Sequence, residues 1–169
     1  MKRKPFLLLT GIFVFSVCQG QQNTVNVFAL AKEKYYTEHS LFLTDSPLVL
    51  YQETSFNEPR TIDEEYSIIL RIRLSDTAKA KQAVKLDFAK DSAIIACTFF
   101  LVSSWEWDTT RKPESVTGTI TFQQWTDKKI KALLDLEITG YRNQSYLYKG
   151  SRIYEITDRK LNNFGILNQ

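Results

Sequence analysis

Apolar and polar residues alternate along much of the chain, a pattern that is typical of β-strands with one buried face. The segment KIKALLDLEIT (129–139) shows it most clearly, because every even position from 130 to 138 is apolar. The segments 66–74, 84–88 and 116–122 alternate in the same way. The other stretches that we interpret as strands are 24–31, 32–38, 41–52 and 145–157. The pattern predicts about nine short strands.

Two pairs of these strands are close enough to form hairpins. The stretch 41–52 is expected to turn at Asp45-Ser46-Pro47, a sequence with typical turn chemistry. The segments 116–122 and 129–139 are joined by a short connection, in which we expect Trp125-Thr126-Asp127 to form the loop. This loop sets the predicted cross-strand pairs, which are Phe122 with Ile130, Ile120 with Ala132, Gly118 with Leu134, and Val116 with Leu136. It also places Trp125 at an exposed tip.

Two segments depart from simple alternation. SAIIACTFFLVSSWEW (92–107) is apolar on both faces, which predicts a strand covered on both sides. DTAKAKQA (76–83) contains good helix formers but no apolar stripe, so it is either a turn of helix or an exposed loop. With no repeat or long linker in the sequence, we expect one all-β antiparallel domain over 21–169, either a β-sandwich or an open β-barrel with little helix.

The N-terminal segment has the features of a secretory signal peptide. Three basic residues, 2–4, precede twelve uncharged residues, 6–17, a run too short to span a bilayer. Cleavage after Gly20 would discard Cys18. The alternative is that Cys18 becomes the lipid-bearing first residue of a lipoprotein, although FSVC fits the lipobox pattern only loosely. We therefore predict export to the periplasm or the cell exterior, or lipid anchoring to the envelope.

Removing the predicted signal peptide changes the charge of the chain. The full chain has 22 Lys and Arg residues against 19 Asp and Glu residues, and three of these bases lie at 2–4, so 19 bases face 19 acids in the mature chain. Proteins that bind nucleic acids normally carry a basic surplus, and an anionic membrane surface also attracts basic residues. We predict no nucleic-acid partner, and membrane contact only through the signal peptide or a lipid at Cys18.

The sequence offers few residues for catalysis or metal binding. His39 is the only histidine, and we interpret it as an exposed strand residue. Cys97 lies in a doubly apolar segment and is expected in the core. One histidine and one remaining cysteine cannot form a zinc site, and Asp63-Glu64-Glu65 lacks the calcium-loop pattern. The sequence therefore predicts no cofactor, no metal site and no catalytic residue set.

Two groups of residues remain as candidates for function. Trp105, Trp107 and Trp125 could contact a glycan or a protein partner, since exposed rings stack on sugars and pack against proteins. Glu106 and Asp108 share a strand face and form the carboxylate pair of a glycan-hydrolase hypothesis. The leading hypothesis is a binding or interaction module without catalytic activity. The alternatives are a barrel that carries a small apolar or sugar ligand, and the hydrolase.

Three short motifs point to covalent modification. Asp76-Thr77-Ala78, Asp91-Ser92-Ala93 and Asp108-Thr109-Thr110 each resemble an O-glycosylation acceptor pattern that occurs in some exported bacterial proteins. All three fall in predicted turns or loops. Aspartate next to serine or threonine is also ordinary turn chemistry, so the sequence leaves both interpretations open.

Overall fold

The computed structural model describes residues 24–26, 36–43, 47–56, 66–103, 115–139 and 145–160. Its elements are β1 (Thr24–Asn26), β2 (Tyr36–Leu43), β3 (Leu48–Phe56), β4 (Tyr66–Leu74), α2 (Thr77–Ala83), β5 (Lys85–Asp87), β6 (Ile95–Ser103), β7 (Ser115–Trp125), β8 (Lys129–Thr139) and β9 (Ser145–Thr157). The predicted all-β fold is confirmed, and the stretch 145–157 coincides with β9.

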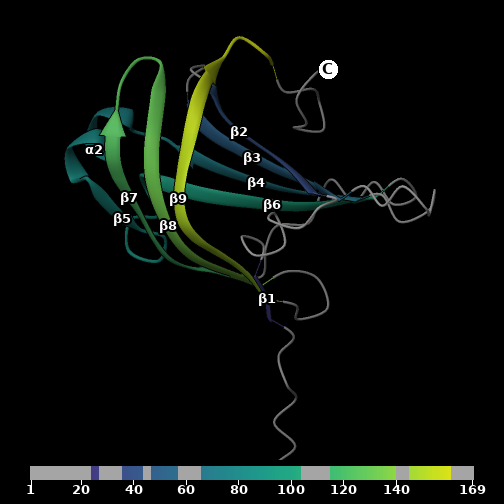
Figure 1. Ribbon diagram of the computed structural model, residues 1–169. Helices are drawn as coiled ribbons and strands as arrows, with labels where there is room; N and C mark the ends of the chain where they lie inside the picture. The colour runs from purple at the N-terminus through teal and green to yellow at the C-terminus, as the bar shows by residue number, and fades with distance from the viewer. Residues whose placement is uncertain are drawn as a thin grey trace, which may run out of the picture.

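The strands form a mostly antiparallel, nearly closed barrel. Their order is β5-β7-β8-β9-β2-β3-β4-β6, with β1 alongside β9. Strands β7, β8 and β9 form one wall, and β2, β3, β4 and β6 form the wall behind it (Figure 1). The β2–β9 and β1–β9 pairs are parallel, and every other pair in the described part of the chain is antiparallel. Of the two predicted architectures, the β-barrel is therefore the one that the protein adopts.

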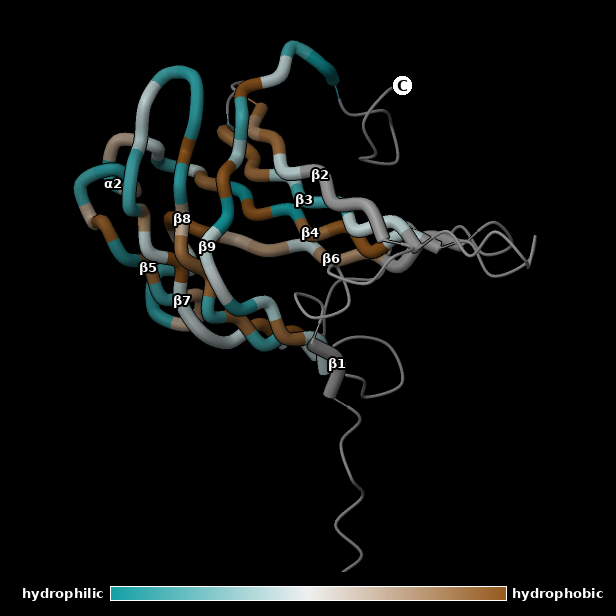
Figure 2. The backbone as a smooth tube through the Cα atoms, in the orientation of Figure 1, coloured by the Kyte–Doolittle hydropathy of each residue, from teal (hydrophilic) through white to brown (hydrophobic). Residues whose placement is uncertain are grey.

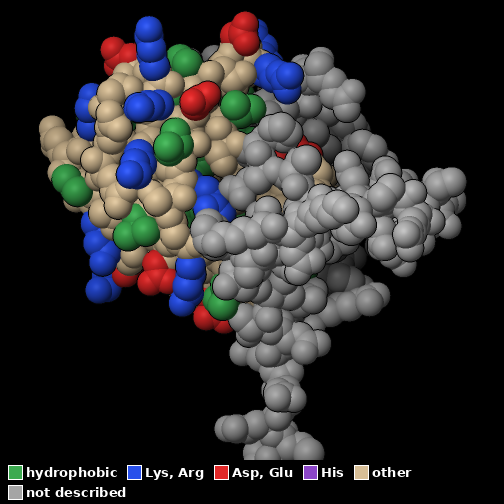
Figure 3. Space-filling model, viewed as in Figure 1, with side chains coloured by type: hydrophobic (Ala, Val, Ile, Leu, Met, Phe, Trp, Pro, Cys, Tyr) green, Lys and Arg blue, Asp and Glu red, His purple; other side chains and the backbone are tan. Residues whose placement is uncertain are grey.

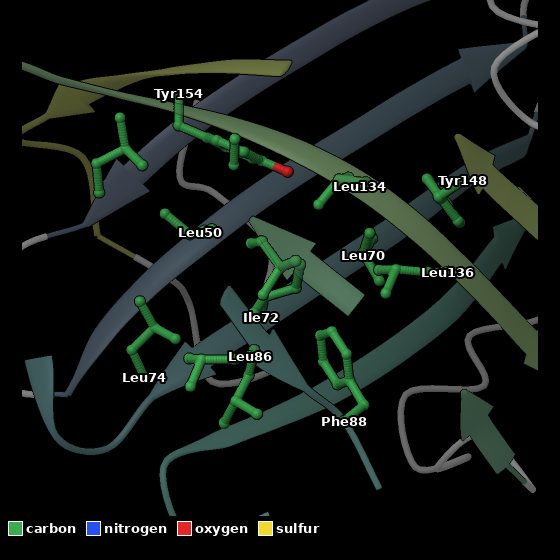
Figure 4. Close-up of a cluster of buried hydrophobic side chains, with 14 of the residues drawn as sticks. Leu50, Leu70, Ile72, Leu74, Leu86, Phe88, Leu134, Leu136, Tyr148 and Tyr154 are labelled. Atoms are coloured by element: carbon green, nitrogen blue, oxygen red, sulfur yellow. The ribbon is translucent and has the colours of Figure 1, made fainter. Parts of the chain in front are cut away.

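The main core lies inside the barrel. The even-numbered residues 68–74 of β4 and 130–138 of β8 point inward and are buried, as alternation predicts, and they meet inward residues of β3, β5 and β9 (Figure 4). Hydrophobic and hydrophilic positions alternate along the strands of the front wall (Figure 2). The largest fully buried side chains include Tyr51, Tyr148, Tyr154, Leu50 and Ile68.

The predicted β7–β8 register is wrong by two residues. Phe122 pairs with Ala132 rather than Ile130. The other three predicted pairs shift likewise, to Ile120 with Leu134, Gly118 with Leu136, and Val116 with Ile138. A two-residue shift keeps every apolar side chain on the same face, so hydrophobic patterning does not distinguish the two registers. The hydrophobic pattern therefore predicts which face is buried, whereas the register of the pairing depends on the geometry of the turn.

A β-bulge after Phe122 explains how the turn differs from the prediction. The register breaks between Phe122 and Gln124, and Trp125 pairs with Ile130. The extra residue reverses the alternation of faces, which turns Trp125 toward the core. The loop is therefore Thr126-Asp127-Lys128, and the Thr126 hydroxyl donates to the Lys129 carbonyl oxygen across 3.0 Å.

A second apolar cluster lies on the outer face of the back wall. It consists of Leu43, Tyr51, Ile69 and Phe100, with Leu41 and Val49 packed against them. Phe99 and Phe100 are both buried although they are on opposite faces of β6, so the predicted two-sided burial of this strand holds there. It does not extend to Ala96, which is exposed. The guanidinium of Arg71 lies 4.3 Å from the centre of the Phe100 ring.

The segment 76–83 contains a short helix. Asp76 is the N-cap of α2, and its carboxylate accepts a hydrogen bond from the Lys79 backbone N–H at 3.0 Å. Ala80 is buried against the main core. The helix ends at Val84, whose φ of 60° is rare for a β-branched residue.

Candidate binding site inside the barrel

Polar side chains gather on one side of the barrel interior. The inward positions of β4, β6, β7 and β8 whose side chains the structure describes are apolar or glycine. In contrast, three neighbouring strands carry polar residues that point inward. These are Ser40 on β2, Gln52 and Thr54 on β3, and Tyr146, Tyr148, Arg152 and Tyr154 on β9. We call this set the interior polar stripe.

Gln52 and Thr54 have unmet hydrogen-bonding capacity. Gln52 is 1% exposed and Thr54 is fully buried. Within the described part of the chain, neither the Gln52 amide oxygen and nitrogen nor the Thr54 hydroxyl has a hydrogen-bond partner. A buried polar group without a partner costs about 1–3 kcal/mol, so native proteins rarely retain one without a reason.

The strand register places Gln52 in one row with Tyr154. Gln52 pairs with Ser40 of β2, and the next residue of β2, Leu41, pairs in parallel with Glu155, the residue that follows Tyr154 on β9. Two strand spacings, about 10 Å, therefore separate the backbones of Gln52 and Tyr154. The Tyr154 hydroxyl points into the buried cluster (Figure 4). An amide and a phenol from two strands thus face the same part of the interior.

Arg152 brings a positive charge to the stripe. Its side chain is 8% exposed, and its Nη1 donates to the Ser151 carbonyl oxygen at 3.2 Å. Arg152 pairs with Ala132 of β8, two residues along β9 from Tyr154. At the other end of the stripe, burial raises the pKa of Tyr146, whose ring centre lies 4.7 Å from that of Phe99 on β6. The stripe therefore runs along β9 inside the barrel.

Cys97 lies on the inner face of β6, opposite Ile72. The residue is half-buried and packs against the main core. Burial raises the pKa of its thiol to about 12, and the nearby Arg71 charge opposes this shift. A thiol that stays protonated at neutral pH is a poor nucleophile, which agrees with the predicted core role.

Trp125 differs from its predicted position. The residue is half-buried and packs against the main core, and its ring centre lies 4.7 Å from that of Phe122. The prediction that Trp125 projects from the hairpin tip is therefore wrong, and the bulge is the physical reason. Contact of Trp125 with a glycan or protein stays a prediction, now resting only on the exposed part of its ring.

The other predicted site residues lie outside what the structure describes. These are Cys18, Trp105, Glu106, Trp107 and Asp108. The acidic triplet Asp63-Glu64-Glu65, which the sequence did not assign as a site, also lies outside the described residues. The backbone of His39 belongs to β2, opposite Glu53, and its side chain is not described. Of the residues predicted for ligand contact, hydrolysis or lipidation, Trp125 is the one that lies in the described part of the chain.

The sequence analysis missed the interior polar stripe, although the signal was present. Gln52 follows Leu48 and Leu50 at the same alternating position, and Arg152 lies between Tyr148 and Tyr154 in the same way. A polar residue at a position that alternation assigns to the core is unusual and marks a site.

Neither the rest of the described surface nor the comparisons with known proteins add a candidate site. Basic and acidic side chains are interspersed over the face shown in Figure 3. Among the described residues, no three His, Cys, Asp or Glu side chains converge to hold a metal ion, and none of the helical stretches is long and apolar enough for a membrane span. No family model, curated protein or solved structure matches the chain.

Proposed function

We propose that the protein is an exported binding protein without catalytic activity, and that its barrel carries a small molecule in contact with the interior polar stripe. The observation that carries this proposal is the buried amide of Gln52, whose donor and acceptor atoms lack partners among the described residues. A ligand with a hydrogen-bond donor and an acceptor offsets the cost of that amide. The facing apolar wall suits the rest of such a ligand.

The ligand enters by local opening of the barrel. The Gln52 amide atoms are closed off from solvent, so side chains or strands must move before a ligand reaches them. The strand order ends at β5 and β6, and no strand pairing joins these two within the described residues. Separating this seam breaks no strand ladder, so we propose it as the entrance.

Mass spectrometry of the exported, full-length chain tests this proposal. We expect native spectra to show one non-covalent small molecule per chain, which denaturing spectra release. A lipid at Cys18 would persist under denaturing conditions, so the two additions are distinguishable. The Gln52→Leu variant should lose the bound molecule, because leucine fills the space of the amide without its hydrogen bonds.

Gln82→Leu is the matched control. Gln82 is an exposed glutamine of α2, so the control variant should keep the bound molecule. If the wild-type chain has the same mass under native and denaturing conditions, and Gln52→Leu merely raises the midpoint of urea unfolding, Gln52 is a structural residue and the carrier proposal is wrong.

A further inference from the structure

Two of the predicted modification motifs lie on the described surface with the same local arrangement. In Asp76-Thr77-Ala78 and in Asp91-Ser92-Ala93, the aspartate is half-buried and the next two residues are exposed. Asp76 precedes α2, and Asp91 lies in the turn between β5 and β6. Both hydroxyl groups are therefore open to a modifying enzyme.

Each aspartate has a structural role that its neighbours do not share. The Asp76 carboxylate accepts from the Lys79 backbone N–H, and the Asp91 carboxylate accepts from the Asp87 backbone N–H at 2.8 Å. These bonds explain why aspartate occurs at both positions. They do not explain why an exposed hydroxyl residue and then an exposed alanine follow each aspartate. The repeated arrangement favours a recognition sequence over turn chemistry alone.

The two motifs lie at one end of the barrel. The Ser75 backbone N–H donates to the Ile94 carbonyl oxygen at 2.8 Å, which joins the segment leading to Thr77 with the segment that follows Ser92. Each hydroxyl residue is only two positions from this bond. One enzyme approaching this end of the protein reaches both.

We propose that Thr77 and Ser92 are O-glycosylation sites of the exported protein. The donor is a glycosyl phosphate. The hydroxyl oxygen of Thr77 or Ser92 attacks the anomeric carbon of the donor, forming a new C–O bond as the bond from that carbon to the phosphate oxygen breaks. The phosphate leaves with the electron pair, and the hydroxyl proton passes to a base of the transferase. The aspartate and alanine on either side identify the acceptor. This proposal depends on export and is independent of ligand carriage.

Peptide mapping of the exported chain from its own organism tests the proposal. We expect a sugar mass on the peptide with Thr77 and another on the peptide with Ser92. Thr77→Ala and Ser92→Ala should each remove one glycan completely. Asp76→Asn and Asp91→Asn should do the same while the hydroxyl remains, because asparagine still caps a helix or turn but lacks the carboxylate. Circular dichroism confirms that these variants fold.

Thr126 provides the matched control. It is an exposed threonine in the β7–β8 turn that follows a tryptophan rather than an aspartate, so its peptide should carry no sugar. The chain without residues 1–20, retained in the cytoplasm, should also carry none. Unmodified Thr77 and Ser92 in the exported chain would overturn the proposal, and full glycosylation of the two asparagine variants would overturn the recognition by aspartate.

Discussion

The two walls of the barrel use the same alternation in different ways. The front wall, β7 to β9, buries its inner face and exposes charges outside, such as Asp135 and Glu137. The back wall buries its inner face too, but its outer face carries the second apolar cluster, in which Ile69 is 1% exposed. A strict alternation with charges therefore indicates a solvent-facing wall, and apolar residues on both faces indicate a wall with a second buried layer.

The largest test of this comparison replaces one outward residue on each wall. Ile69→Ala should lower the free energy of unfolding by about 2–5 kcal/mol, because it removes buried methyl groups and leaves a cavity. Leu133, on the outer face of the front wall, is 41% exposed. Leu133→Ala should lower it by less than about 1 kcal/mol. Urea denaturation measures both, and equal losses would contradict the difference between the walls.

The pH dependence of stability tests the desolvation of the back wall. The Cys97 thiol has a pKa of about 12 in the folded protein against an ordinary value of 9.0. Because the pKa is raised on folding, the thiol of the unfolded chain loses its proton first. The stability that the protonated thiol contributes is therefore complete below pH 9 and is lost as the pH rises from 9 to 12. At pH 10 the free energy of unfolding should be about 1.4 kcal/mol lower than at pH 7 because of this thiol.

Cys97→Ala is the reference for that measurement, because it removes the thiol and keeps the lysines and tyrosines that also titrate. Urea denaturation of both proteins with reductant present, at pH 7 and pH 10, gives the difference directly. If the free energy of unfolding falls between pH 7 and pH 10 by no more in the wild type than in Cys97→Ala, the thiol is not desolvated.

The interactions of charged groups on the two walls should also differ, by smaller free energies. A double-mutant cycle with Arg71→Met and Phe100→Leu should give a coupling energy of about 1 kcal/mol, because the guanidinium lies over a buried ring. Lys149→Gln with Asp135→Asn should give less than about 0.5 kcal/mol, since this ion pair of 3.6 Å is exposed. A larger coupling on the front wall would reverse the comparison.

The sequence predicted the buried faces and both hairpins, β2–β3 and β7–β8, correctly, and the register of the second hairpin wrongly. Alternation assigned Ile130, Leu134 and Ile138 to the core correctly, because burial depends on residue type. The register of β7 depends on a bulge at which no glycine or other marker stands, so Phe122 was paired wrongly. The interior polar stripe was missed for a further reason. Gln52 stands at the same alternating position as Leu48 and Leu50, but the sequence alone does not show that this position is closed off from solvent, which depends on its packing beside Leu70 of β4 and the rest of the barrel.

The parallel pairing of β2 with β9 governs when the chain can fold. Leu41 and Glu155 are 114 positions apart, and their strands hold the two walls together. Contacts this distant form late, because closing a long loop is entropically costly and slows folding. A chain that emerges N-terminus first therefore lacks β9, the strand that closes the barrel against β2, until nearly the whole chain has emerged. Under the export we propose, late closure would keep the barrel open until translocation is nearly complete.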